Sequence, residues 1–240
     1  MDKTKIVAEA GLNHNGEFPK ALEMIKVAKE CGCDAIKFQY FDPDILCVNR
    51  NDFTNYNLLK KICPRPQWIP LLKKECDRAR IEFACTVFCK YSAQDVAPYV
   101  KSFKVASPEV LDIPFLKELA AYKKTLVLST GKATFDDLDR VFREVTDNVI
   151  LLYCVSKYPA EVDDYSVGMV DRLRERYKVP IGISDHTRDI DFSIAAADKG
   201  VFMIEKHFKC DEDCVDAAVS LNPAQLAELT RAVRHIDRYK

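Results

Sequence analysis

The stretch VFMIEKHFK, residues 201–209, begins as a buried strand and ends in charged groups. Residues 201–204 are all apolar, which is typical of a strand that is covered on both faces in a parallel sheet. Glu205, Lys206 and His207 follow directly. The same change from apolar to polar residues recurs along the chain, and its repetition predicts both the fold and the position of a functional site.

Seven similar apolar runs precede this one, with helical patterns between them. The predicted strands are residues 5–10, 35–40, 81–85, 102–107, 125–130, 149–154, 180–184 and 202–206. The helical segments run from 19–32 to the last one, 222–239, where Asn222 and Pro223 are typical of a helix start. Segment 41–67 is the least regular, and we expect a long loop over one face.

Eight strand-then-helix units predict an α/β protein with a (β/α)8 TIM-barrel fold. We expect a single catalytic domain over residues 1–240, because no linker or low-complexity tract interrupts the chain. A doubly wound open sheet is the alternative, since periodicity alone does not close a barrel. The first strand-to-helix turn, GLNHNG at 11–16, lacks the G-x-G-x-x-G spacing of a dinucleotide-binding fold.

Composition narrows the class of protein. The net charge of -1 gives no bulk attraction to nucleic acid or to an anionic membrane, so neither is an expected partner. The first residues lack the apolar core of a secretory signal, and we expect a cytoplasmic protein. Its ten cysteines are then expected to be reduced thiols. Pairs such as Cys31/Cys33, Cys85/Cys89 and Cys210/Cys214 lack the repeated C-x-x-C frame of a zinc site.

Polar residues lie at or just after the end of every predicted strand. In a (β/α)8 barrel these ends meet at one face, where the chemistry is carried out. Lys37 and Lys104 stand within apolar runs, and because a buried, unpaired lysine is costly, an anionic ligand is expected beside them. An ion pair inside the barrel is the alternative for Lys37. The hydroxyl groups suited to phosphate or carboxylate oxygens are those of Thr86, Ser107, Ser129 and Ser184.

Two histidines, His186 and His207, follow the seventh and eighth predicted strands. Neighbouring imidazoles of this kind can hold a divalent cation and leave coordination positions open for substrate and water. A structural role for each histidine is the alternative. His14 and His235 complete the set, and His235 is expected on the surface of the last helix.

Four motifs, IVAEAGLNHNG (6–16), DAIKFQ (34–39), GISDHTRD (182–189) and IEKHF (204–208), occur in this order. Weaker ones, FACTVF, KVASPE, LSTGKA and CVSKYP, lie between them. Through these motifs the chain resembles the barrel domain of the sialic acid synthase family, including its legionaminic and pseudaminic relatives. The likeness extends over nearly the whole chain.

The resemblance implies a reaction. Phosphoenolpyruvate condenses with an N-acetyl-hexosamine such as N-acetylmannosamine and with water, by C–O cleavage, to a nine-carbon 2-keto-3-deoxy sugar acid and phosphate. His186 and His207 would hold a divalent metal, manganese foremost, with magnesium or cobalt as alternatives, and Lys37 and Lys104 would bind phosphoenolpyruvate. The residues implied around its phosphate or carboxylate are Thr86, Ser107, Ser129, Ser156 and Ser184. Those implied near the sugar or the reacting atoms are Glu9, Gln39, Glu109, Tyr158 and Asp216. A homodimer is expected.

Some residues depart from the family pattern. The family usually has His at Tyr153, Pro at Val87 and Gly at Pro108, and Ala217 replaces a His in DAAVS. The family's barrel is normally followed by a small antifreeze-like domain, whereas this sequence stops at Lys240, just after its last helical pattern. We therefore expect intact metal and phosphoenolpyruvate sites and an altered sugar side.

Two other functions fit part of the pattern. A Schiff-base aldolase acting on a related sugar acid would use Lys37 or Lys104 as its nucleophile, but would leave the two histidines without a role. The second alternative function is that of a barrel that binds a sugar acid or phosphate without turnover.

Overall fold

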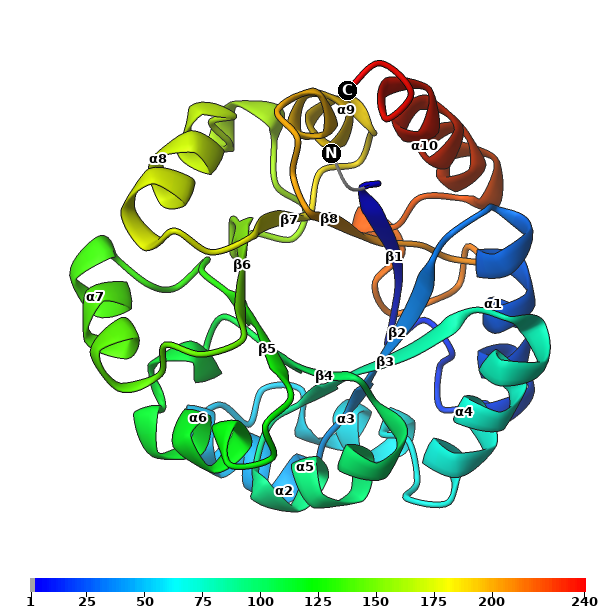
Figure 1. Ribbon diagram of the computed structural model, residues 1–240. Helices are drawn as coiled ribbons and strands as arrows, with labels where there is room; N and C mark the ends of the chain where they lie inside the picture. The colour runs from blue at the N-terminus through cyan, green and yellow to red at the C-terminus, as the bar shows by residue number, and fades with distance from the viewer. Residues whose placement is uncertain (1–2) are drawn as a thin grey trace.

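Parallel strands alternate with helices throughout residues 3–240, the part of the chain that the computed structural model describes. The strands are β1 (Lys5–Gly11), β2 (Ala35–Tyr40), β3 (Glu82–Val87), β4 (Ser102–Val105), β5 (Thr125–Ser129), β6 (Val149–Cys154), β7 (Ile181–Asp185) and β8 (Met203–His207). Each pairs with the next, and β8 pairs with β1, so the sheet closes into a barrel (Figure 1). The predicted (β/α)8 fold is confirmed, and the open-sheet alternative is wrong.

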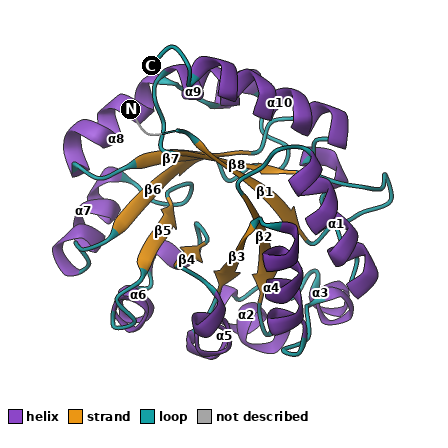
Figure 2. Ribbon diagram, turned by 45° about the vertical axis from the view of Figure 1, so that its right-hand side comes forward, coloured by secondary structure: helices purple, strands orange, loops and turns teal. Residues whose placement is uncertain are grey.

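Helices surround the strands, as Figure 2 shows. They are α1 (Phe18–Glu30), α2 (Pro43–Arg50), α3 (Tyr56–Ile62), α4 (Trp68–Ala79), α5 (Lys90–Val96), α6 (Ile113–Ala120), α7 (Phe135–Glu144), α8 (Gly168–Tyr177), α9 (Asp191–Asp198) and α10 (Pro223–Ile236). Short 3-10 turns are η1 (Ala97–Tyr99), η2 (Glu109–Leu111), η3 (Val162–Asp164) and η4 (Ala217–Val219). Each helix within residues 3–240 is too short or too polar to cross a membrane.

The long loop expected over residues 41–67 is wrong, because two short helices, α2 and α3, lie there. The side chain of Asp42 caps α2 by accepting hydrogen bonds from the backbone of Asp44 and Ile45, and Pro43 occupies the first turn. A helix of eight residues shows little periodicity, so this cap was the available signal. Helix α5, which no pattern predicted, begins with the reverse contact, since Ser92 Oγ inside the helix accepts from the backbone N–H of Cys89, the residue before it.

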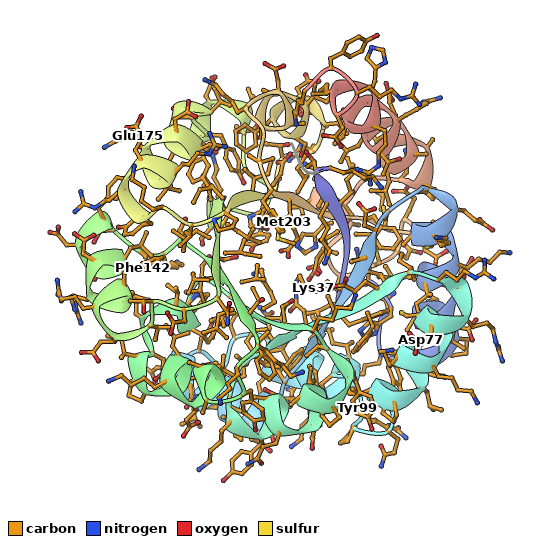
Figure 3. All side chains as sticks on the ribbon, viewed as in Figure 1. Lys37, Asp77, Tyr99, Phe142, Glu175 and Met203 are labelled. Carbon is orange, nitrogen blue, oxygen red and sulfur yellow. The ribbon has the colours of Figure 1, made fainter. Side chains whose placement is uncertain are left out.

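The interior of the barrel is filled in layers. Its lower layer consists of the apolar side chains of Val7, Ala35, Val127, Leu152 and Met203. Since side chains alternate along a strand, the residues two positions further on point into the same interior. Those residues are Glu9, Lys37, Ser129, Cys154 and Glu205. Figure 3 shows Lys37 and Met203 inside the ring of strands, whereas Asp77 and Glu175 project from the outer helices.

The ten cysteines are all free. Cys31, Cys33 and Cys85 are buried core residues, and the surrounding protein raises the pKa of Cys33 to about 12, chiefly because burial disfavours the thiolate. This agrees with the expectation of reduced thiols that serve as small apolar side chains.

We predict that Gly182→Ala destabilises the barrel. A Cβ at Gly182 would lie 2.6 Å from Leu152 Cδ2 and 2.6 Å from Met203 Cγ, inside the apolar layer. Overpacking of this kind costs about 1–3 kcal/mol. The control is Gly168→Ala at the start of α8, where the nearest atom would be 3.7 Å away and Ala is a good helix former. Urea unfolding measures both, and equal stability of the two variants would contradict the prediction.

Candidate functional site

A cavity of about 540 Å³ opens where the strands end. Its lining contains every residue predicted for the site except one. Those present are Glu9, Lys37, Gln39, Thr86, Lys104, Ser107, Ser129, Ser156, Tyr158, Ser184, His186, His207 and Asp216. The barrel therefore brings together side chains from all eight strand ends, as the sequence pattern predicts.

The exception is Glu109, which lies in η2 with a buried side chain and is not part of the lining. In its place the cavity contains Glu205, which the sequence analysis did not select. Glu205 and His207 are two positions apart on β8 and share its inner face, whereas Lys206 between them points outward. The alternation along β8 was the signal that could have identified Glu205.

Buried charges of both signs meet at the base of the cavity. Lys37 Nζ lies 2.6 Å from Glu9 Oε2 and 3.7 Å from Glu205 Oε2, and it donates a hydrogen bond of 2.8 Å to Thr86 Oγ1. For Lys37 the ion pair inside the barrel, the alternative left open by the sequence, is therefore what the structure contains. Its charge is compensated without an anionic ligand.

Lys104 is less well compensated than Lys37. Its Nζ donates to Ser129 Oγ at 2.6 Å and to Val105 O at 3.2 Å, but the nearest carboxylate oxygen, Glu205 Oε1, is 3.9 Å away. A negative group placed beside Lys104 would therefore be stabilised more than a negative group placed beside Lys37.

The pKa shifts of Lys37, Lys104 and Glu205 arise from their burial and from their charges on one another. Burial alone would lower the pKa of Lys37, but the charges of Glu205 and Glu9 outweigh it and raise that pKa. Burial lowers the pKa of Lys104, and the Glu205 charge does not make up the difference. Burial would raise the pKa of Glu205, but Lys104 and Lys37 hold it below its ordinary value. Glu205 is thus an ionised carboxylate between the two lysines.

The two predicted histidines lie next to each other on one side of the cavity. The ring centroids of His186 and His207 are 5.8 Å apart, with the planes inclined by 68°. His186 Nδ1 lies 2.7 Å from the Val155 carbonyl, to which it donates, so the lone pair is on its Nε2, which lies 3.2 Å from Ser184 Oγ. His207 Nδ1 is buried without a hydrogen-bond partner, 3.7 Å from Asp216 Oδ2.

These two rings fit a cation site. Burial, assisted by the neighbouring His207, lowers the pKa of His186 to about 4, so its ring is neutral at neutral pH, the form that binds metals. Within residues 3–240 no third His, Cys, Asp or Glu completes a metal-binding cluster with them. A cation held here would take its remaining ligands from substrate and water, and coordination positions left open in this way are a feature of catalytic metal sites.

Tyr158 and Asp216 flank the histidines. The Tyr158 ring stacks on His186 with centroids 4.2 Å apart and lies 6.1 Å from the His207 ring. Asp216 Oδ2 accepts a hydrogen bond of 3.0 Å from the backbone of Leu12. Gly11 makes this approach possible, because its φ is +51° and an added Cβ would lie 2.4 Å from Asp216 Oδ2.

Hydroxyl groups and amides complete the walls. Ser184 Oγ donates to Glu205 Oε1 at 3.0 Å, and Gln39 Nε2 donates to Glu9 Oε1 at 2.8 Å. Ser107 Oγ accepts from the backbone of Gly131 at 3.1 Å. These bonds hold the two carboxylates and the strand 4 and 5 loops in place around the cavity.

The mouth of the cavity contains residues that the sequence analysis did not consider. Segment 41–67 contributes Asp52 and Asn55 to the lining, and the loop after β5 contributes Lys132. Lys132 is exposed, and none of the described carboxylates lies within ion-pair distance of it. Lys132 lies in the LSTGKA motif just after β5, and that position was its signal, whereas the turn carrying Asp52 and Asn55 has no pattern that tied it to the site.

Comparison with known proteins gives a consistent result. The model of the NeuB family matches residues 24–240. The N,N'-diacetyllegionaminic acid synthase of Campylobacter jejuni is 32% identical, over 99% of this chain and 78% of that protein. The human N-acetylneuraminate-9-phosphate synthase is 28% identical, over 97% of this chain and 70% of that protein.

Solved structures agree. The N-acetylneuraminic acid synthetase of Leptospira borgpetersenii superposes with a TM-score of 0.92 at 30% identity, covering 99% of this chain and 85% of that one. A truncated 3-deoxy-D-arabino-heptulosonate 7-phosphate synthase of Thermotoga maritima superposes with a TM-score of 0.74 at 14% identity, which shows a shared fold alone. The resemblance found in the motifs is confirmed, and the chain belongs to the NeuB family.

Proposed function

We propose that the protein condenses phosphoenolpyruvate with an N-acetyl-hexosamine, such as N-acetylmannosamine, and with water. The observation that carries the proposal is one cavity with buried lysines and hydroxyl groups on one side and two adjacent histidines, His186 and His207, on the other. Relatives at 28–32% identity that are named as synthases of legionaminic acid and of N-acetylneuraminate 9-phosphate support this reaction class.

The reaction forms and breaks few bonds. The enol carbon C3 of phosphoenolpyruvate bonds to the aldehyde carbon of the sugar, and the oxygen of water adds to C2. The bond between C2 and the phosphate oxygen then breaks, so that phosphate leaves and a 2-keto-3-deoxy acid of nine carbons remains. The protein has to hold two reactants in register and to stabilise negative charge throughout.

The lysine side of the cavity suits phosphoenolpyruvate. Lys104 has spare positive charge, and Ser129 holds its ammonium group in place. Lys37 lies beside Thr86, so an anion that contacts both lysines also meets hydroxyl donors. Ser107, Ser156 and Ser184 are further hydroxyl groups in the lining that would surround the phosphate or carboxylate.

The histidine side suits the acceptor. His186 and His207 would hold a divalent cation, manganese foremost with magnesium or cobalt as alternatives, and when bound it supplies Lewis-acid polarisation of the acceptor carbonyl. Tyr158 and Asp216 flank these rings and would contact the sugar.

Of the two carboxylates expected to manage protons, Glu9 and Glu109, Glu9 is the one that lines the cavity and would take this role. It lies in the lining between Gln39, which donates to Oε1, and Lys37, next to Oε2. The role of Glu109 stays a prediction, as do the homodimer and the cytoplasmic location.

A Schiff-base aldolase is the second candidate, and one observation favours it. The lowered pKa of Lys104 makes its amine a better nucleophile than that of Lys37, whose pKa is raised. This function leaves His186 and His207 without a role. Borohydride trapping with pyruvate, which would label Lys104, separates it from the proposed reaction.

The decisive assay measures phosphate. The protein is incubated with phosphoenolpyruvate, manganese and a panel of N-acetylated aldoses, and we expect aldose-dependent release of phosphate that EDTA abolishes. Folded protein that releases none with any aldose would refute the proposed reaction and leave the Schiff-base aldolase or a barrel that binds without turnover. Release that persists in EDTA would remove the metal from the proposal.

We predict that His186→Ala and His207→Ala each abolish manganese binding, because each removes one of two protein ligands. Electron paramagnetic resonance of free manganese measures the binding. His235→Ala on the outer helix α10 is the matched control, since His235 is exposed and does not line the cavity. Wild-type affinity in either cavity variant would disprove the ligand pair.

We predict that Lys132→Gln raises the KM for phosphoenolpyruvate about 2- to 5-fold with little change in kcat, since an exposed ion pair is worth up to about 1 kcal/mol. Lys132→Arg should restore the KM. The control is Lys74→Gln, an exposed lysine on α4 outside the lining. A KM unchanged by Lys132→Gln would show that this lysine makes no contact with the substrate.

A further inference from the structure

A fully buried ion pair lies outside the cavity, on the outer side of β7 and β8. Asp185 Oδ2 and Lys206 Nζ are 3.0 Å apart, and both side chains are 0% exposed. The two residues are direct partners in the β7–β8 register. Each precedes a cavity histidine, His186 or His207, and points away from the cavity because side chains alternate.

Thr187 ties this pair to the backbone on the far side of His186. Lys206 Nζ donates to the Thr187 carbonyl at 2.7 Å and to Thr187 Oγ1 at 3.0 Å. Asp185 Oδ1 accepts from both the backbone N–H and the hydroxyl of Thr187, each at 2.8 Å. Ser193 Oγ on α9 donates to the other oxygen, Asp185 Oδ2, at 2.6 Å. Residues 185 and 187, on either side of His186, are thus fixed to β8.

The remaining contacts of His186 fix its ring. Its backbone N–H donates to the Tyr165 hydroxyl at 3.1 Å, and its Nδ1 donates to the Val155 carbonyl at 2.7 Å. The Tyr165 hydroxyl in turn donates to the Ser184 carbonyl at 3.2 Å. The histidine therefore has one orientation, with Nε2 toward the cavity.

A contribution to folding stability does not by itself explain the buried Asp185–Lys206 ion pair. Two buried charges lose their hydration, and well-packed apolar residues of similar volume are often as stabilising or more so. Hydrophobic side chains at these two positions would pack against the helices, but they would supply no donor or acceptor for the backbone around His186. What the charges add is a defined geometry for the turn after β7.

We propose that Asp185, Lys206 and Thr187 are positioning residues that fix His186 relative to His207, so that both rings can ligate one divalent cation. This inference rests on the proposed function, because that function assigns the cation to the two histidines. Residues that orient metal ligands from behind typically contribute 10- to 100-fold in metal affinity.

The first test compares two variants of Thr187. Thr187→Val removes the hydroxyl and keeps the shape, and we expect manganese affinity to fall by about 10-fold or more. Thr187→Ser keeps the hydroxyl and should stay near the wild type. In the metal-free protein, nitrogen NMR of the histidine rings should show altered His186 signals in Thr187→Val and wild-type signals in Thr187→Ser.

The second test removes both charges. The double variant Asp185→Asn/Lys206→Met leaves no unpaired charge, and we expect a folded protein with urea stability near the wild type and manganese affinity about 10-fold lower or weaker. If the double variant does not fold, the comparison of Thr187→Val with Thr187→Ser tests the positioning role by itself.

The outcomes separate this inference from the proposed function. A wild-type protein that binds no manganese overturns the proposed metal site, and the inference with it. A wild-type protein that binds manganese, with unchanged affinity and unchanged histidine signals in folded Thr187→Val, overturns only the positioning role. Failure of Thr187→Val to fold would assign the network to structure alone and would overturn that role as well.

Discussion

The constraint on which the site depends is the alternation of side chains along strands that close into a barrel. Closure gives each strand one inner and one outer face, and successive side chains point alternately to one and to the other. On β8 the inner face carries Met203, Glu205 and His207, whereas Lys206 points outward to Asp185. One strand therefore supplies the apolar floor, a charged wall and a histidine to the cavity, and a buried ion pair behind it.

Charge balance inside the barrel follows from this arrangement. Two lysines and two carboxylates are buried together at the base of the cavity, and their positions relative to one another decide their pKa shifts. Lys37 sits between Glu9 and Glu205, whereas Lys104 has one carboxylate oxygen at 3.9 Å and is the less compensated. The structure thus distinguishes two lysines that look alike in sequence. An anionic group in the cavity would therefore be stabilised more by Lys104 than by Lys37.

The histidines illustrate how a local motif acquires its geometry. SDHT and EKHF each contain a charged residue next to a histidine. The register of β7 with β8 brings Asp185 opposite Lys206, and the histidines then lie on the same inner side. The ion pair and the proposed cation site therefore lie on opposite faces of a single strand pairing, which explains why a charged residue directly precedes the histidine in both motifs.

The sequence by itself determined the class of fold, the strand ends that carry the chemistry and all but one of the lining residues it nominated. It could do so because burial on both faces makes a strand continuously apolar, so that polar interruptions are conspicuous. Only the tertiary structure decided that segment 41–67 lies at the mouth, that Glu205 lies between Lys37 and Lys104, and that Glu109 stays outside the cavity. These outcomes depend on caps of short helices, on strand register and on which face a side chain occupies. Each is a relation between residues distant in the chain, or a contact too local to leave a periodic pattern.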